Sequence, residues 1–177
     1  VRFHDFDIPL RVMRAIHDQK FTYCTAIQGK ALEDVLAGKD LIGKANTGTG
    51  KSAVFLITIL TRLMRKSNAG KKKEVRALVL APTRELVMQI AKDGKELAKY
   101  SNLIIQPVYG GVDYQKQMDA LRLKRCDVVV ATPGRLIDFL GKNVVDLGRC
   151  EILVLDEADR MLDMGFIPDV RRIVGRT

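Results

Sequence analysis

The sequence lacks the features that mark secreted and membrane-spanning proteins. No apolar run approaches the ~20 residues that a transmembrane helix needs, and the first residues do not follow the basic-then-apolar order of a signal peptide. The 3 cysteines, Cys24, Cys126 and Cys150, are widely spaced and include no Cys-x-x-Cys pair. They predict neither disulfides nor a zinc site, and are typical of small buried side chains in a reducing compartment. We therefore expect a cytoplasmic protein without a membrane segment.

Internal repeats and domain-splitting linkers are also missing, so the 177 residues fit one globular unit with a substantial core. A composition of 47% hydrophobic and 29% charged residues excludes a disordered chain. The net charge of +9 favours a polyanionic partner, most often nucleic acid. A basic solvated surface explains the same charge, so charge alone leaves both readings open.

A stretch at residues 45–52, Ala-Asn-Thr-Gly-Thr-Gly-Lys-Ser, has the spacing of a phosphate-binding loop. A short apolar run precedes it and a helical apolar pattern follows it, which is the strand–loop–helix setting that such a loop requires. The general pattern G-x-x-x-x-G-K-[ST] has glycine at its first position, where this chain has Ala45.

The residue types in this stretch suit a nucleotide phosphate. Gly48 and Gly50 let backbone N–H groups face an anion, and the following helix adds the positive end of its dipole. Lys51 supplies a cation and Ser52 a hydroxyl ligand for Mg²⁺. The predicted phosphate-binding residues are Ala45, Asn46, Thr47, Gly48, Thr49, Gly50, Lys51 and Ser52.

From residue 40 onward, short apolar runs alternate with amphipathic helical patterns. The predicted strands are Asp40–Lys44, Ala77–Leu80, Ile104–Val108, Asp127–Ala131 and Ile152–Leu155. The predicted helices lie near residues 51–66, 84–99, 112–123 and 133–141. This alternation predicts an α/β fold with a mostly parallel central sheet and helices on both faces. Ligands of such sheets bind beyond the carboxyl ends of the strands.

Two further helices are predicted before residue 39. Ile8, Val12 and Ile16 recur at helical spacing, and Pro9 suits a first turn. A second apolar set ends at Gly38, a residue type that commonly follows a helix.

Three acidic residues, Asp156, Glu157 and Asp159, directly follow the last predicted strand. Phosphoryl transfer needs one carboxylate to hold Mg²⁺ and a second group to orient the attacking water. Asp156 suits the first role and Glu157 the second. The alternative is an acidic first helical turn that interacts favourably with the helix dipole, which the nearby phosphate-loop pattern makes the weaker explanation.

The sequence Asp-Glu-Ala-Asp at 156–159, together with residues 45–52, resembles the DEAD-box family of ATP-dependent RNA helicases. Alanine is usual in that family at the position of Ala45. Other family segments occur in the expected order, namely Ala-Pro-Thr-Arg-Glu-Leu at 81–86 (motif Ia), the glycine pair 110–111 and Thr-Pro-Gly-Arg at 132–135 (motif Ib). The resemblance covers essentially the whole chain and implies the RecA-like P-loop NTPase fold. Short sequence segments at residues 24–28 and 143–148 resemble those of bacterial members of the family, including the RhlB type.

Residues 21–28 resemble the family's Q motif, in which a glutamine reads the adenine edge of ATP. This resemblance assigns adenine recognition to Gln28, whose amide can pair with N6 and N7, and places Phe21 and Tyr23 near the base. The family's usual glycine and two prolines are replaced here by Lys20, Cys24 and Ala26. Those changes affect the expected rigidity of the loop more than the adenine contact.

The resemblance also implies RNA binding through sugar and phosphate, without base readout. Glycine permits close approach of a phosphate chain, and helix starts and arginines favour phosphates. Without the family context, each Pro–Gly segment would be read as a turn. The predicted RNA-binding residues are Pro82, Thr83, Arg84, Gly110, Gly111, Thr132, Pro133, Gly134 and Arg135.

In the family's mechanism, Lys51 corresponds to the lysine at the β- and γ-phosphates, and Ser52 with Asp156 to the Mg²⁺ ligands. Glu157 corresponds to the residue that positions the hydrolytic water. Asp159 is expected to couple ATP chemistry to a Ser-Ala-Thr motif, which lies downstream in the family and does not occur in this sequence.

The expected organisation is an N-terminal helical segment with the Q motif at residues 1–38, packed on a RecA-like ATP-binding domain at 39–177. The family uses a second RecA-like domain, which this chain lacks. That domain carries arginines that stabilise the γ-phosphate, and losing such a residue costs about 10³–10⁵ in rate. We therefore expect a parent RNA-dependent ATPase and helicase that remodels RNA duplexes or RNA–protein complexes, and a 177-residue part that is inactive or nearly so.

Two other functions remain open at this stage. The chain can act only as a nucleotide- and RNA-binding module, or belong to another P-loop enzyme such as a GTPase or DNA helicase. A GTPase is disfavoured because the Asn-Lys-x-Asp guanine-reading element is absent. DNA as the polymer stays open, because phosphate contacts do not read the 2′-hydroxyl. Protein partners and oligomeric state have no signal in the sequence.

Overall fold

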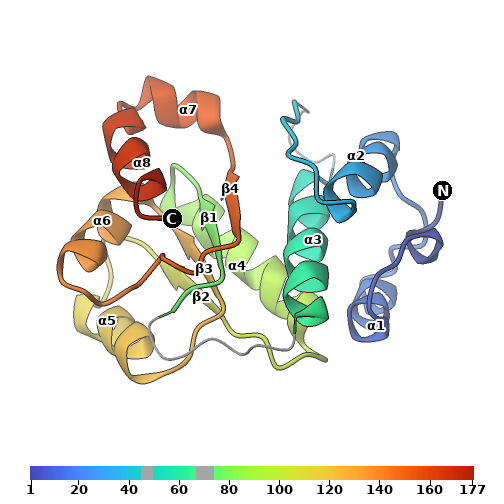
Figure 1. Cartoon of the computed structure of the whole chain (residues 1–177), viewed down its shortest axis with the longest axis horizontal. Helices are drawn as coiled ribbons and strands as arrows, with labels where there is room; N and C mark the ends of the chain where they lie inside the picture. Colours follow the sequence, from blue (N-terminus) through green and yellow to red (C-terminus); the bar gives the residue numbers. More distant parts are fainter. Residues whose placement is uncertain (45–49, 67–73) are drawn as a thin grey trace. The chain divides into compact units, whose positions relative to one another are not determined.

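The computed structural model describes residues 1–44, 50–66 and 74–177. Its contacts divide the chain into two units. One unit comprises residues 1–67 and 93–102, and the other comprises residues 68–92 and 103–177. Figure 1 shows the elements in sequence order.

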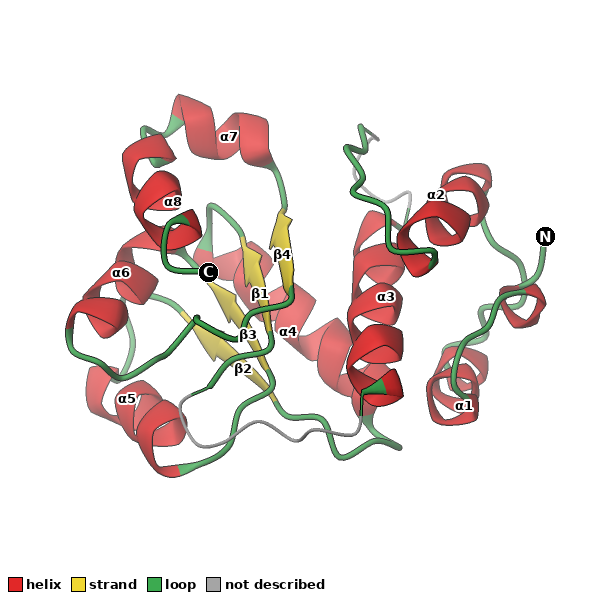
Figure 2. Ribbon diagram, viewed as in Figure 1, coloured by secondary structure: helices red, strands yellow, loops and turns green. Residues whose placement is uncertain are grey.

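The second unit is built around a parallel four-stranded sheet (Figure 2). Its strands are β1 (Ala77–Leu80), β2 (Ile105–Val108), β3 (Val128–Ala131) and β4 (Ile152–Leu155), in the spatial order β2-β3-β1-β4. Leu80 is paired with both Ala131 and Leu155, and Val108 with Ala131, so all four strands end at one edge. The sheet confirms the α/β prediction and brings the segments that follow the strands to that edge.

Helices cover this sheet because the strands are apolar on both faces. Alternate strand residues such as Leu78, Leu80 and Val129 enter one core with side chains of α5 (Tyr114–Leu123), α6 (Pro133–Gly141), α7 (Ala158–Asp163) and α8 (Ile167–Val174). The intervening residues, including Val79 and Val130, are equally buried. The first half of α4 (Arg84–Ala98), which belongs to this unit, contributes buried Val87 and Ile90.

The other unit is helical. It contains the short η1 (Phe3–Asp5), then α1 (Leu10–Asp18), α2 (Ala26–Leu36), α3 (Lys51–Arg65) and the end of α4. Both α1 and α2 pack on α3, and the contacts bury Phe3, Ile16 and Leu32. The predicted starts and stops are confirmed: α1 begins after Pro9, and Gly38 follows α2 with a left-handed φ of +90°. Glycine adopts this conformation without a Cβ penalty.

One predicted strand is absent from the described structure. Residues 40–44, predicted as Asp40–Lys44, have no regular structure, and the Ile42 side chain is fully exposed. The run holds only two adjacent apolar residues between polar or glycine neighbours, and the segment makes no ladder of hydrogen bonds with a partner strand. A strand needs that pairing to satisfy its backbone groups.

Among the described residues, no helix has the length and apolar composition that a membrane span needs.

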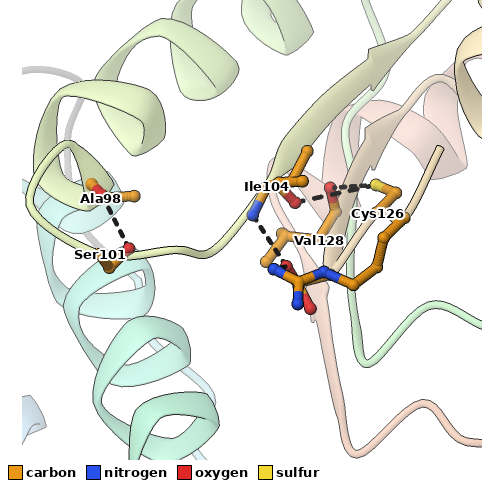
Figure 3. Close-up of polar contacts among 7 residues, drawn as sticks. Ala98, Ser101, Ile104, Cys126 and Val128 are labelled. Carbon is orange, nitrogen blue, oxygen red and sulfur yellow. Dashed lines mark hydrogen bonds and ion pairs between the residues drawn. The ribbon is translucent and has the colours of Figure 1, made fainter. Parts of the chain in front are cut away.

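The three cysteines are free thiols with different degrees of burial. Cys126 is buried, and its Sγ contacts the carbonyls of Val128 at 3.2 Å and Ile104 at 3.8 Å (Figure 3). Cys24 and Cys150 are only half-buried, and desolvation raises the pKa of both thiols. The prediction of small buried side chains is therefore right for Cys126 and too strong for the other two.

The apolar residues after the acidic turn also separate into two groups. Met161 is buried in the sheet core, and Phe166 packs against it. Leu162 and Met164, whose apolar side chains favour a place in the core, are instead exposed. A short helix packed on one side can bury only one stripe, and Leu162 and Met164 lie off that stripe.

Candidate functional site

The carboxyl edge of the sheet gathers four of the predicted segments. In three of the strands, β1, β3 and β4, the hydrogen-bonding pattern continues one residue beyond the end: Ala81 N donates to Ala131 O at 3.0 Å, Thr132 N to Val108 O at 3.0 Å, and Asp156 N to Leu80 O at 2.9 Å. The first residue of each of these segments is thereby bonded to the last residue of a neighbouring strand. We call this the rim ladder.

Two arginines from different helix starts flank the glycine pair that follows β2. Gly111 has φ +81°, and a Cβ built on it would lie 3.3 Å from Arg84 Nη1. A Cβ built on Gly110 would lie 4.0 Å from Arg135 Nη2. Arg84 is half-exposed, and its distance to Glu85 is 3.9 Å, so its charge is only weakly neutralised. We call Arg84, Gly110, Gly111 and Arg135 the arginine–glycine cradle; its donors and open backbone suit a phosphate chain.

The two threonines at these helix starts play different parts. Thr83 Oγ1 accepts a hydrogen bond from Leu86 N at 3.3 Å and so caps α4. Thr132 precedes Pro133, the first residue of α6, and its hydroxyl makes no capping bond. The Thr132 hydroxyl is therefore the better placed of the two to contact a ligand. The other predicted residues of these segments are buried Pro82 and exposed Gly134.

Gln117 positions the backbone before the glycine pair, a role that the sequence reading missed. Its buried amide makes two bonds to one residue: Oε1 accepts from Tyr109 N at 3.1 Å, and Nε2 donates to Tyr109 O at 3.0 Å. Both backbone groups of Tyr109 are thus satisfied just where strand pairing has ended. The sequence feature that could have indicated this role is the position of Gln117, which lies with Met118 and Leu121 on the buried face of α5.

Replacing Gln117 with leucine keeps most of the volume but leaves Tyr109 N–H and C=O without these partners. We expect a loss of about 2 kcal/mol in the free energy of unfolding, since each buried group left unpaired costs about 1–3 kcal/mol. Chemical unfolding measures the loss. Gln115→Leu, on the exposed side of the same helix, is the control and should be close to wild type. Equal stability of the two variants would contradict the role of Gln117.

The acidic turn after β4 has a strained backbone. Glu157 precedes α7 with φ +51°, a conformation that costs a non-glycine residue about 1–3 kcal/mol and is found most often at functional sites. Asp156 Oδ1 accepts from Glu157 N at 3.1 Å. The Glu157 carboxylate lies 3.4 Å from Arg160 Nη1, and exposed Asp159 accepts from Arg160 N at 3.0 Å. These contacts set the direction of three carboxylates at the sheet edge.

In the helical unit, the predicted adenine reader, Gln28, contacts Gly50 of the predicted phosphate loop. Gln28 Nε2 donates to Gly50 O at 3.3 Å, and a Cβ on Gly50 would lie only 2.1 Å from that nitrogen. Gly50 also has φ +79°, so both conformation and space require glycine there. Gln28 Oε1 accepts from Thr25 N at 2.9 Å, as part of a capping box that starts α2. An amide has two N–H groups and two lone pairs, so one of each stays available for a base.

The other predicted nucleotide residues in this unit are only partly described. Lys51 and Ser52 are half-buried at the start of α3. Phe21 and Tyr23 are exposed, with the Arg2 guanidinium 5.5 Å from the Tyr23 ring. Lys20 has φ +59°, a left-handed conformation that glycine would adopt at lower cost. Residues 45–49, predicted to complete the loop, lie outside the described residues.

The donor set is compatible with Mg²⁺ bound together with a nucleotide. No group of three His, Cys, Asp or Glu side chains able to hold a metal occurs in the described part of the chain. Magnesium is usually held by one or two protein oxygens plus substrate phosphates and water. Asp156 offers a half-buried carboxylate in the sheet unit, and Ser52 offers a hydroxyl in the helical unit; each residue type is a suitable Mg²⁺ ligand.

Comparison with known proteins gives consistent matches. The sequence model of the DEAD/DEAH box helicase family matches residues 25–177. The chain is 53% identical to the ATP-dependent RNA helicase RhlB of Pseudomonas putida, over 99% of this chain and 45% of that protein. It is 48% identical to the RhlB of Xanthomonas axonopodis pv. citri, over 99% of this chain and 31% of that protein. The chain therefore spans less than half the length of these relatives.

A solved structure is also similar in fold and sequence. It is described as a hypothetical ATP-dependent RNA helicase from Sulfolobus tokodaii. The TM-score is 0.84 with 38% sequence identity, over 96% of this chain and 47% of that one. This likeness agrees with the α/β fold predicted from the strand and helix pattern, and with the RecA-like fold that the family resemblance implies.

Proposed function

Because the chain belongs to the DEAD/DEAH box helicase family, we propose that it is the ATP- and RNA-binding first RecA-like domain of an RNA helicase. The predicted family is confirmed, and the predicted RhlB type agrees with 53% identity to RhlB from Pseudomonas putida. The observation that carries the proposal is the carboxyl edge of the sheet. The arginine–glycine cradle and the acidic turn Asp156–Glu157 meet there through the rim ladder.

ATP is the proposed nucleotide. Residues 45–52 would surround its phosphates, with Lys51 near the β- and γ-phosphates at the positive end of the α3 dipole. Gln28 would read the adenine edge with the N–H and lone pair that its contacts to Gly50 and Thr25 leave available. The exposed rings of Phe21 and Tyr23 would lie beside the base.

Mg²⁺ would be held by Ser52 and Asp156 together with ATP oxygens, and it would neutralise charge on the β- and γ-phosphates. Asp156 is prepared for this role by its backbone bond to Leu80, which fixes the start of its side chain at the sheet edge. Glu157 has a left-handed backbone conformation and a carboxylate 3.4 Å from Arg160 Nη1, and it would orient and deprotonate the attacking water. Asp159 would couple this turn to a downstream segment.

RNA is the proposed polymer, bound through sugar and phosphate. Arg84 and Arg135 supply charge-assisted donors, and the glycine pair lets the chain approach closely. The starts of α4 and α6 add N–H groups, and Thr132 adds a hydroxyl that no cap uses. Binding of this kind depends on salt and not on base sequence.

The proposed organisation is a helical Q-motif segment at residues 1–38 and a RecA-like domain at 39–177, within a longer cytoplasmic protein that has a second RecA-like domain. In that protein, ATP hydrolysis would drive local RNA duplex opening or remodelling of RNA–protein complexes. The 177-residue part alone would bind nucleotide and RNA with little or no turnover, because the arginines of the second domain act on the γ-phosphate.

Side-by-side ATPase assays of the 177-residue chain and the full-length protein test this proposal, each without polymer, with single-stranded RNA and with single-stranded DNA. We expect RNA to stimulate turnover only in the full-length protein. Equal stimulation by DNA would contradict RNA as the specific polymer. No stimulation by any polymer would favour a nucleotide-binding module instead.

Gln28→Ala is expected to reduce the preference of the full-length protein for ATP over GTP by about tenfold. Two base hydrogen bonds contribute about 0.5–1.5 kcal/mol each. Equilibrium titration with fluorescent ATP and GTP analogues measures the ratio of the two affinities. Gln28 also bonds to Gly50, so its loss can weaken the binding of both nucleotides. The ratio of ATP affinity to GTP affinity is therefore the informative quantity. Gln19→Ala, an exposed glutamine of the same unit, is the control. An unchanged ATP-to-GTP ratio in Gln28→Ala would remove the adenine-reading role.

A further inference from the structure

Arg135 of the arginine–glycine cradle packs over aromatic rings and makes no ion pair with a carboxylate of the described residues. Its Nη1 is buried and has no hydrogen-bond partner, and no ion pair to Arg135 is formed within the described residues. The guanidinium carbon lies 4.9 Å from the centre of the Tyr114 ring and 5.7 Å from that of Phe139. A guanidinium over aromatic faces keeps its full charge while its position is restricted. The other end of the group, Nη2, is the end next to Gly110.

A carboxylate is close enough to compete for Arg135 but is engaged elsewhere. Asp138 follows Arg135 by three residues on α6, a spacing that commonly allows an ion pair. Its Oδ2 instead accepts from the Tyr114 hydroxyl at 2.5 Å, and its Oδ1 lies 3.6 Å from Lys142 Nζ. Lys142 Nζ also donates to the Tyr114 hydroxyl oxygen at 2.5 Å. The hydrogen bond from Tyr114 is the largest cause that holds the pKa of Asp138 below its ordinary value, so the carboxylate stays ionised.

We propose that Tyr114 is a positioning residue for RNA binding: its ring supports the Arg135 guanidinium beside Gly110, and its hydroxyl, with Lys142, keeps Asp138 from pairing with Arg135. Arg135 then has no direct ion pair, and its guanidinium can contact the RNA phosphate. The inference rests on the proposed function, in which Arg135 contacts RNA. It adds a residue of α5, outside the predicted RNA-binding segments, whose effect on RNA passes through Arg135.

The chain contains a natural control for this arrangement in its helical unit. Tyr100 has the Arg14 guanidinium 4.3 Å and the Lys99 ammonium 5.2 Å from its ring centre. Its hydroxyl donates to Asp18, whose carboxylate lies 2.9 Å from Lys99. An arginine, a lysine and an aspartate therefore surround each of the two tyrosines. No predicted RNA-binding residue takes part in the Tyr100 group, so loss of its ring reports only general effects of removing such a cluster.

The test is a set of RNA affinities for the full-length protein, measured by fluorescence anisotropy with single-stranded RNA and a non-hydrolysable ATP analogue. Arg135→Ala is expected to weaken RNA binding by about tenfold or more. Tyr114→Leu should weaken it by about threefold to tenfold, the range of a cation–π contact. Adding Tyr114→Leu to Arg135→Ala should cause no further loss, because Tyr114 acts through Arg135. Tyr100→Leu should bind RNA as wild type does, and ATP affinity should be unchanged in all variants.

A second pair of variants keeps the ring and tests the hydroxyl, so that the proposal stays testable if Tyr114→Leu fails to fold. Tyr114→Phe should weaken RNA binding by about twofold to threefold, as Asp138 becomes able to approach Arg135. Adding Asp138→Asn should restore wild-type affinity, whereas Asp138→Asn alone should change little. Thermal unfolding of each variant establishes that it is folded at the assay temperature.

The outcomes separate this inference from the proposed function. Unchanged RNA affinity in Arg135→Ala would contradict the RNA contact itself. A large loss in Arg135→Ala with no loss in Tyr114→Leu would overturn the positioning role, as would additive losses in the double variant. A loss in Tyr100→Leu equal to that in Tyr114→Leu would also overturn it. So would failure of Asp138→Asn to restore the affinity of Tyr114→Phe.

Discussion

Glu157→Gln is expected to lower RNA-stimulated ATP hydrolysis by the full-length protein about 10²- to 10⁴-fold, the usual contribution of a general base. Glutamine has nearly the same shape but cannot accept the proton from the attacking water. ATP affinity should be unchanged, since Glu157 is proposed to contact water and not the nucleotide. Steady-state turnover and equilibrium ATP binding measure the two effects separately.

Two features of the turn make this substitution informative. Glutamine can keep the left-handed backbone at position 157, because neither side chain is β-branched. It loses the charge that faces Arg160, an exposed pair whose loss costs little stability. Asp163→Asn, at the end of the same helix, is the matched control and should retain full turnover. Persistent hydrolysis in Glu157→Gln would assign the water-positioning role to another residue.

Lys51→Ala is expected to weaken ATP binding by about a hundredfold. The ammonium would make charge-assisted contacts to two phosphates, each contributing about 1.5–3 kcal/mol. Lys51 begins α3, where Gly50 opens the helix and the dipole already favours an anion, so the alanine variant should keep its fold. Titration with a fluorescent ATP analogue measures the loss.

Lys30→Ala, on the exposed side of α2, is the control for removing one positive charge from the same unit. It should leave ATP affinity unchanged. Wild-type affinity in Lys51→Ala would contradict the assignment of residues 45–52 as the phosphate loop. A loss in hydrolysis without a loss in binding would place Lys51 in the chemical step alone.

The sheet and its edge are largely predictable from the sequence, because the apolar runs at 77–80 and 152–155 each follow a charged residue and match β1 and β4. The helix starts at Lys51, Arg84 and Pro133 follow from glycine, threonine and proline signals that act locally. The predicted strand at 40–44, which the structure lacks, had the weakest apolar pattern. Two apolar residues do not distinguish a strand from an exposed loop.

The contacts that could not be predicted from the sequence are those between residues of different elements of the chain. Gln117 has no local sign of its bonds to Tyr109, because a buried glutamine and an exposed one look the same in a helical pattern. Tyr114 and Arg135 come from α5 and α6, and their approach depends on how both helices pack on the sheet. The residue types in the sequence predict which side chains can bind phosphate. The packing of the helices determines where the charged groups of those side chains lie.

The rim ladder has a mechanical consequence for the proposed enzyme. In this ladder β1 is the central member: its last carbonyl, on Leu80, receives the N–H of Asp156, and the N–H of Ala81 is given to Ala131. Any sideways movement of one of these segments must stretch its backbone bond to the neighbouring strand, and such bonds are costly to break. The loops proposed to bind RNA and the acidic turn are therefore held by the same sheet edge, so closure on RNA would have to move this edge as a unit.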